Sequence, residues 1–248
     1  MKVVVDLWKT SLHGAEIGIR QKEQHRAKAR QFSKDMDLYG RIKVDGKDYG
    51  YVGYRKALWE NEDPFKKRLV VKAFSNEMTW LGTIEENIIR ELSLTLASRE
   101  PSPAFTVIMP RTKIVFPIER LRPRGFETDA MILTYIDDEK NTVKTYVIKS
   151  KRFSIGNDWS LVDLVTGKEI IKVDGKVLDI GGRYELKSKT VEDMRLFIIV
   201  ALYAGTLRFY DDLKEKLENI QKTLKKKKEL PAFDKQAVSF FFNPRVRR

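Results

Sequence analysis

The chain has 248 residues, and 48 Lys and Arg against 35 Asp and Glu give it a formal net charge of +13. It has no cysteine and only two histidines, His13 and His25, which excludes disulfide frameworks, thiolate chemistry and most zinc sites. The positive charge favours polyanionic partners such as nucleic acid, acidic lipid head groups or an acidic protein.

The N-terminal segment, residues 1–38, begins with a strand-like run and continues with a basic stretch. The run Met1–Asp6 places an acid after three valines, where a secretory signal would continue to be apolar, so we expect a cytoplasmic protein. The stretch from Ile19 to Gln31 is polar on every face, which predicts a solvated helix or an arm that orders on a partner. The abundance of Lys, Arg and Glu resembles the usage of thermophiles.

Residues 40–84 have a strand-like pattern. Asp45-Gly46 lies between two strand-like runs and predicts a type I′ hairpin, and a second turn is expected at Ser75-Asn76. Over 85–98, Ile88, Ile89, Leu92 and Leu96 recur at helical spacing behind an acidic first turn, which predicts a helix.

Strand patterns resume after Pro103 and continue to Lys187. They cover residues 105–109, 114–116, 130–136, 143–148, 159–162, 169–173, 177–180 and 183–187. The acidic residues at 137–141 sit between two of these strands and are expected to form a solvated turn rather than a metal site.

The apolar run from Leu196 to Leu207 is the most informative stretch of the chain. It is shorter than the roughly 20 residues that a bilayer requires, and it is apolar on all sides, so it predicts a helix enclosed by the protein's own core. Ser188 or Thr190 is the expected N-cap, with Glu192 and Asp193 in the first turn.

A Lys-rich helix is expected to follow, with an apolar stripe on one face. The stripe either packs on the chain's own barrel or binds a protein partner. It consists of Leu213, Leu217, Ile220 and Leu224.

The segments Phe153–Asp163 and Gly167–Leu186, followed by Glu192-Asp193 and the apolar run, resemble the C-terminal half of the LURP-one-related family. That family belongs with the Tubby C-terminal domains and the phospholipid scramblases. The resemblance implies a closed antiparallel barrel around a central hydrophobic helix. It also implies binding to membranes or phosphoinositides, or a regulatory role, and it implies no catalysis.

We therefore expect an α+β fold, mainly antiparallel β, with a closed Tubby-like barrel around a central hydrophobic C-terminal helix and with peripheral helices. Residues 1–38 would form a basic N-terminal arm or helix. Residues 39–212 would form the barrel, with the central helix at about 192–210, and residues 213–248 a Lys-rich helix and a tail.

One catalytic alternative comes from the motif Lys-x-Asp-Gly, which marks the nucleophilic lysine of DNA and RNA ligases and capping enzymes. It occurs at Lys43 and again at Lys172. The later motifs of those enzymes fit poorly, and a hairpin turn with this chemistry accounts for both copies without catalysis.

Clusters of cations carry the remaining functional signal. Together with nearby aromatic residues they suit single-stranded nucleic acid, and the same charges suit an anionic membrane surface. The candidate binding residues are Arg20, Lys22, Arg26, Lys28, Arg30, Arg111, Lys113, Arg120, Arg122, Arg124, Lys225, Lys226, Lys227, Lys228, Arg245, Arg247 and Arg248.

The sequence thus predicts a non-catalytic module that binds an anionic partner, and the first candidate is nucleic acid or a nucleoprotein assembly. The alternative is a peripheral phospholipid- or phosphoinositide-binding protein, and a third hypothesis is a nucleotidyltransferase that uses Lys43. We expect no cofactor and no metal ion.

Overall fold

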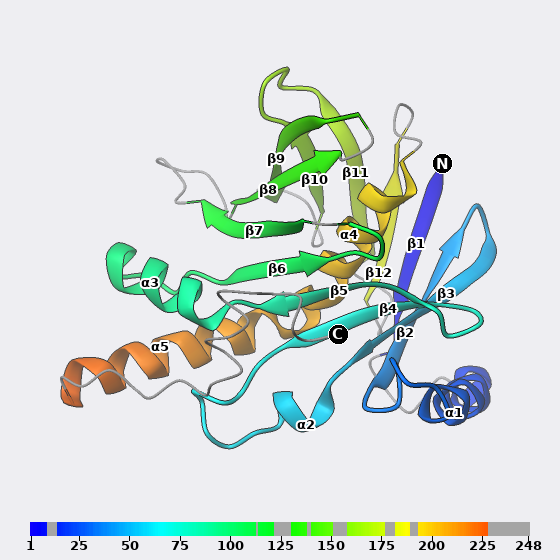
Figure 1. The fold of residues 1–248 in the computed structure, drawn as a ribbon, viewed down its shortest axis with the longest axis horizontal. Coiled ribbons are helices and arrows are strands. Elements are labelled where there is room, and N and C mark those ends of the chain that lie inside the picture. Colours follow the sequence, from blue (N-terminus) through cyan, green and yellow to red (C-terminus); the bar gives the residue numbers. More distant parts are fainter. Residues whose placement is uncertain are drawn as a thin grey trace.

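The computed structural model describes residues 1–8, 14–112, 114–121, 130–137, 140–150, 158–176, 182–188 and 193–227. Within these residues twelve antiparallel strands form one closed barrel, in which each strand pairs with its neighbours in sequence and β1 pairs with β12 (Figure 1). The strands are β1 Lys2–Leu7, β2 Asp37–Val44, β3 Lys47–Tyr54, β4 Val70–Ser75, β5 Trp80–Glu86, β6 Ala104–Ile108, β7 Val115–Leu121, β8 Ala130–Asp137, β9 Thr142–Ser150, β10 Trp159–Asp163, β11 Glu169–Lys176 and β12 Arg183–Lys187.

The N-terminal strand closes the barrel. Val4 of β1 is opposite Lys43 on one side and Glu185 on the other. The barrel therefore starts at residue 2, and the boundary expected at residue 38 does not coincide with an edge of the sheet.

The expected central helix is α4, Met194–Thr206, and its residues from Leu196 to Thr206 are all buried. Inward-facing side chains of all twelve strands form a single core with it. Because the barrel supplies the whole apolar surround, a helix that is apolar on every face is stable here without a bilayer. The N-cap is Asp193, whose side chain accepts a hydrogen bond of 2.9 Å from the backbone N–H of Arg195; Ser188, one of the two caps expected, lies outside the helix.

The two Asp-Gly copies have different structures. Asp45 and Gly46 have φ of 48° and 83°, as a type I′ turn requires, which confirms the predicted hairpin between β2 and β3. Asp174 and Gly175 instead lie within β11, opposite Glu185 and Tyr184 of β12. The turn predicted for this second copy was wrong, because pairing with β12 keeps the backbone extended. The strand predicted at 177–180 lies outside the described residues.

Helix α1, Gly14–Lys28, packs on the outside of the barrel. Ala27 joins a second, smaller core on the outer face, formed with Trp8, Met36, Leu38, Phe74 and Met78. Gln24 fastens the helix to β2, since its amide donates to the carbonyl of Met36 and its oxygen accepts from the N–H of Leu38, both at 2.7 Å. The basic stretch is therefore a docked helix.

Helix α3, Ile88–Ser98, begins later than predicted. Glu85 and Glu86 belong to β5, and Asn87 is the N-cap, accepting a hydrogen bond of 3.1 Å from the N–H of Arg90. The acids expected in the first helical turn are therefore strand residues, fixed by the pairing of β5 with β4 and β6.

Helix α5, Tyr210–Lys227, follows α4 through the short 3-10 helix η1, Leu207–Phe209, and lies against α3 (Figure 1). Leu217 and Ile220 pack on Ile88 and Leu92, with Leu224 partly buried beside them, while Leu213 joins the main core. The apolar stripe of α5 is thus covered by the chain itself. None of the helices in the described part of the chain is long and apolar enough to span a membrane.

Candidate functional site

The candidate cations of α1 separate into two groups. Arg20 pairs with Asp37 at 3.3 Å, and Arg26 pairs with Glu23 at 2.6 Å and donates to the carbonyl of Asn76 at 3.0 Å. These two arginines help to hold α1 on the barrel.

The other cations of this segment are solvated. Lys22, Lys28 and Arg30 are exposed, and they form no ion pair or hydrogen bond with a side chain in the described part of the chain. They are therefore available to an external anion.

Of the cluster predicted around 111–124, the structure describes Arg111 and Arg120, which differ in exposure. Arg111 is exposed, whereas Arg120 is largely buried, pairs with Glu100 at 3.7 Å and donates to the carbonyl of Pro101. Arg120 thus has a structural role, while Lys113, Arg122 and Arg124 lie outside the described residues.

In the C-terminal group, Lys225 and Lys226 are exposed near the end of α5, and the helix ends at Lys227. Lys228, Arg245, Arg247 and Arg248 lie outside the described residues.

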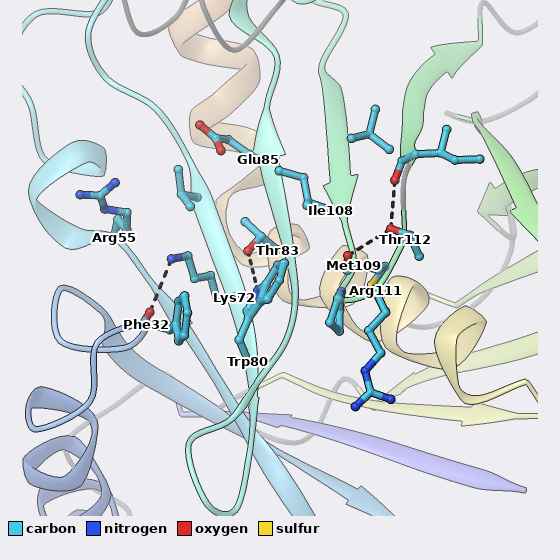
Figure 2. Close-up of a pocket in the computed structure, with 14 residues that line it drawn as sticks. Phe32, Arg55, Lys72, Trp80, Thr83, Glu85, Ile108, Met109, Arg111 and Thr112 are labelled. Atoms are coloured by element: carbon cyan, nitrogen blue, oxygen red, sulfur yellow. Dashed lines mark hydrogen bonds between the residues drawn. The ribbon is translucent and has the colours of Figure 1, made fainter. Parts of the chain in front are cut away.

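A pocket of about 200 Å³ lies on the outer wall of the barrel and is called here the wall pocket (Figure 2). Its floor is the outward face of β4 and β5, with the side chains Val70, Lys72, Trp80, Thr83 and Glu85. One side is closed by Phe32, from the loop after α1, and by Arg55, which precedes the short helix α2, Lys56–Trp59. Residues 108–112, 114 and 115, at and between the ends of β6 and β7, close the other side, and Arg111 is among them.

Two aromatic side chains meet at this pocket. The rings of Phe32 and Trp80 are stacked, with centroids 6.4 Å apart and planes 23° from parallel. The indole N–H of Trp80 donates to the hydroxyl of Thr83 at 2.9 Å, which fixes the orientation of the ring. Phe32 is 44% exposed, although a large apolar side chain is normally covered.

The pocket is rich in positive charge. The ammonium of Lys72 donates to the carbonyl of Phe32 at 3.5 Å, and burial lowers the pKa of Lys72, with Arg55 lowering it further and Glu85 and Asp35 opposing them. Arg111 has a left-handed backbone (φ 60°), and the neighbouring Thr112 braces the loop by donating to the carbonyls of Met109 and Ile114, each at 3.0 Å. The one carboxylate in the lining, Glu85, pairs with Arg68 at 3.5 Å. An anion entering the pocket would therefore meet more cations than acids.

Sequence reasoning missed most of the wall pocket. A register shift beside Ala73 makes Leu81 pack on the barrel core while Trp80 packs on the outer face. Strict alternation along a strand does not predict this, because a bulge moves the residues on one side of it to the other face. Lys72 is the residue by which the sequence could have indicated the pocket. It lies between Val71 and Ala73 of β4, which face the core, so its side chain must face outward.

A second cavity, of about 240 Å³, lies where α4 passes into α5. Its charged groups are largely engaged: Asp158 accepts from the N–H of Gly175 at 2.9 Å, and Lys214 pairs with Asp211 at 3.8 Å and lies 4.7 Å from the ring centroid of Tyr210. Its lining contains two acids and one lysine, so it offers no excess of positive charge to an anion.

A cluster of ionisable groups is buried where α3 and α5 cover the barrel. It contains Arg68, Glu85, Glu86, Glu91 and Lys216. Lys216 of α5 forms an ion pair with Glu86, which also accepts from the N–H of Leu69 at 2.7 Å. All five side chains are buried, and Glu85 also lines the wall pocket.

The lysine of the catalytic hypothesis lies on the outer surface. Lys43 of β2 is 3.9 Å from Asp48 across the hairpin and lines neither described cavity. The described residues contain no group of three or more His, Asp or Glu side chains arranged to hold a metal ion.

Comparison of the chain with protein-family models, with curated proteins and with solved structures finds no match.

Proposed function

We propose that this protein is a non-catalytic binding module for single-stranded nucleic acid, which it binds on the outer surface around α1 and the wall pocket. The observation that carries the proposal is the stacked pair Phe32 and Trp80, beside a pocket lined by Arg55, Lys72 and Arg111. Proteins that bind single strands combine aromatic rings, on which bases stack, with cations that follow the phosphates.

The solvated cations of α1 extend this surface. Lys28 and Arg30 are close in sequence to Phe32, and Lys22 lies on the same helix. Net charge alone would favour any polyanion. The aromatic pair is what favours an unpaired strand, because the ring faces of a duplex are already stacked on one another.

The experiment is a binding titration of purified protein with labelled single-stranded RNA and DNA and with duplexes of the same sequence, at low and moderate salt. We expect single strands to bind more tightly than duplexes, with an affinity that falls steeply with salt. The variant Lys22→Gln/Lys28→Gln/Arg30→Gln should bind weakly. The variant Lys144→Gln/Lys149→Gln/Lys168→Gln is the matched control, because it removes three exposed lysines from strands and a turn on the far side of the molecule from α1 (Figure 1).

Equal binding by both triple variants would contradict the proposed surface, and the absence of any nucleic-acid binding would overturn the function.

A second candidate function, docking on an anionic membrane surface, is favoured by a different observation. Val143, Leu164 and Val165 are exposed large apolar side chains, and Val165 is 88% exposed. The N–H of Leu164 donates to the carbonyl of Thr145 at 2.9 Å, so the start of β9 and the turn after β10 are neighbours.

Exposed lysines flank this apolar tip, among them Lys144 and Lys168. Apolar residues that enter a bilayer interface next to cations that contact acidic head groups are typical of peripheral membrane proteins.

Sedimentation with acidic and with neutral vesicles tests this candidate. Binding to acidic vesicles that is lost in Leu164→Ser/Val165→Ser, with nucleic acid left unbound, would favour it over the first proposal.

We also propose that the fold is related to the Tubby C-terminal domains and the LURP-one-related proteins. The closed antiparallel barrel around a buried C-terminal helix supports this relationship.

A further inference from the structure

We infer that the wall pocket holds a single nucleotide unit, with its base stacked against Trp80 and Phe32 and its phosphate held by Lys72 and Arg111. This inference rests on the proposed function and assigns one site within it. It also extends beyond polymers, since it requires that a free mononucleotide can occupy the same place.

The pair Phe32 and Trp80 suits a nucleobase because the two rings interact weakly and Phe32 is exposed. A separation of 6.4 Å between ring centroids is near the upper limit of the range, about 4.5–7 Å, over which aromatic pairs interact. Phe32 is anchored only by a loop and is half-exposed, whereas Trp80 is held from below through Thr83. A base can therefore displace or join Phe32 while Trp80 provides a fixed platform.

The cations stand on both sides of that platform. Figure 2 shows Lys72 and Phe32 on one side of Trp80 and Arg111 on the other. The ammonium of Lys72 is partly desolvated and donates to a backbone carbonyl, that of Phe32, and a phosphate oxygen would be a stronger acceptor. Arg111 lines the opposite wall of the pocket, on a loop that the hydrogen bonds of Thr112 brace, and supplies the second cation that we assign to the phosphate.

The size of the pocket limits its contents. Its volume of about 200 Å³ is below the roughly 300–1,000 Å³ of sites for drug-sized ligands. It therefore has room to enclose one ring system and not two, and the carboxylate of Glu85 in the lining disfavours a second phosphate at that end. A base must leave its stack to enter, which favours a strand end or an unpaired nucleotide.

The test is titration of the full chain with AMP, UMP, ribose 5-phosphate and inorganic phosphate, measured by calorimetry and by tryptophan fluorescence. Trp8, Trp59 and Trp159 are buried, so quenching on binding would come from the more exposed Trp80. We expect AMP to bind at least tenfold more tightly than ribose 5-phosphate, because the sugar phosphate lacks a base to stack.

Variants distinguish the residues that stack on the base from the lysine that binds the phosphate. Phe32→Ala should weaken AMP binding several-fold, Trp80→Phe should keep binding but lose the quenching, and Lys72→Met should weaken AMP and ribose 5-phosphate alike. Val165→Ala is the control for loss of an exposed apolar side chain elsewhere. Thermal unfolding of each variant shows that the barrel is intact.

The outcomes distinguish this inference from the proposed function. If oligonucleotides bind with the expected salt dependence while AMP does not bind, or binds no better than ribose 5-phosphate, the inference is overturned and the proposed function stands. If AMP binds and is lost with Phe32→Ala while oligonucleotides do not bind, the pocket is a mononucleotide site and the proposed function falls.

Discussion

The hydroxyl of Tyr39, on β2 of the barrel wall, donates a hydrogen bond of 2.9 Å to the carbonyl of Gly205 near the end of the central helix α4. Both residues are buried, and burial raises the pKa of Tyr39 far above its ordinary value, so the hydroxyl keeps its proton and remains a donor. This bond satisfies a polar group in an otherwise apolar interior and fixes the height of the helix in the barrel.

The close approach at Gly205 makes it a sensitive position. A Cβ there would lie 2.8 Å from the Tyr39 hydroxyl, 3.3 Å from Val52 Cγ1 and 3.4 Å from Val71 Cγ1. We expect Gly205→Ala to lower the unfolding free energy by about 1–3 kcal/mol, because the closed wall cannot relax to admit a methyl group. Chemical denaturation measures the change.

Gly18 provides the matched control, since it lies in α1 with no atom within 4 Å of a built Cβ. Gly18→Ala should stabilise the protein by about 0.5–1 kcal/mol through helix propensity. A loss of stability in both variants would contradict the assigned packing.

Glu91 makes the stability of the protein depend on pH. Its carboxyl group is fully buried and accepts from the N–H of Ala104 at 3.0 Å, and burial raises its pKa from 4.5 to about 8 against the opposing effects of that bond and of Arg68. Between these two pH values the folded state keeps a proton that the unfolded state has released. The unfolding free energy should therefore fall as the pH rises from about 4.5 to 8, by an amount on the order of 5 kcal/mol, and then level off.

The variant Glu91→Gln keeps an acceptor for Ala104 and removes the titration. Urea denaturation at pH 5, 7 and 9 should show a flatter profile for this variant, with a gain in stability at the highest pH. An unchanged slope would mean that another group causes the pH dependence.

Removing either Lys216 or Glu86 alone from their ion pair should lower the unfolding free energy. Both side chains are almost fully buried, and burial, with Lys67 and Arg68, lowers the pKa of Lys216. Lys216→Met leaves the Glu86 carboxylate without its cation and should cost about 3–5 kcal/mol, whereas Lys216→Met/Glu86→Gln should recover part of the loss.

Lys222→Met is the control for this cycle. Lys222 pairs with Glu218 at 3.9 Å on the exposed face of the same helix, so its removal should cost less than about 1 kcal/mol. Similar losses at Lys216 and Lys222, measured by denaturation, would contradict a role for the buried pair in docking α5.

The salt dependence of single-stranded nucleic-acid binding should show how many phosphates the protein neutralises. For single strands the slope of log K against log salt is about −0.7 for each phosphate neutralised. Removing the three solvated cations Lys22, Lys28 and Arg30 should therefore make the slope less steep by about 2, while the variant that lacks Lys144, Lys149 and Lys168 keeps it. A shift in affinity with no change in slope would indicate that these residues act through the fold.

The sequence alone determined the features that depend on local chemistry. The apolar run from Leu196 predicted a helix that only a surrounding protein could cover, and α4 is that helix. Asp45-Gly46 predicted its turn because both residues tolerate positive φ.

The tertiary structure decided what the same local patterns become in different surroundings. Asp174-Gly175 has the same dipeptide sequence as the Asp45-Gly46 turn, yet pairing with β12 keeps it in a strand. Glu85-Glu86 forms the end of β5 because β4 and β6 pair with these residues. The wall pocket has the same origin. Phe32, Trp80 and Arg111 come from a loop, a bulged strand and the connection after β6, and the packing of these neighbouring parts of the barrel wall brings them to one place.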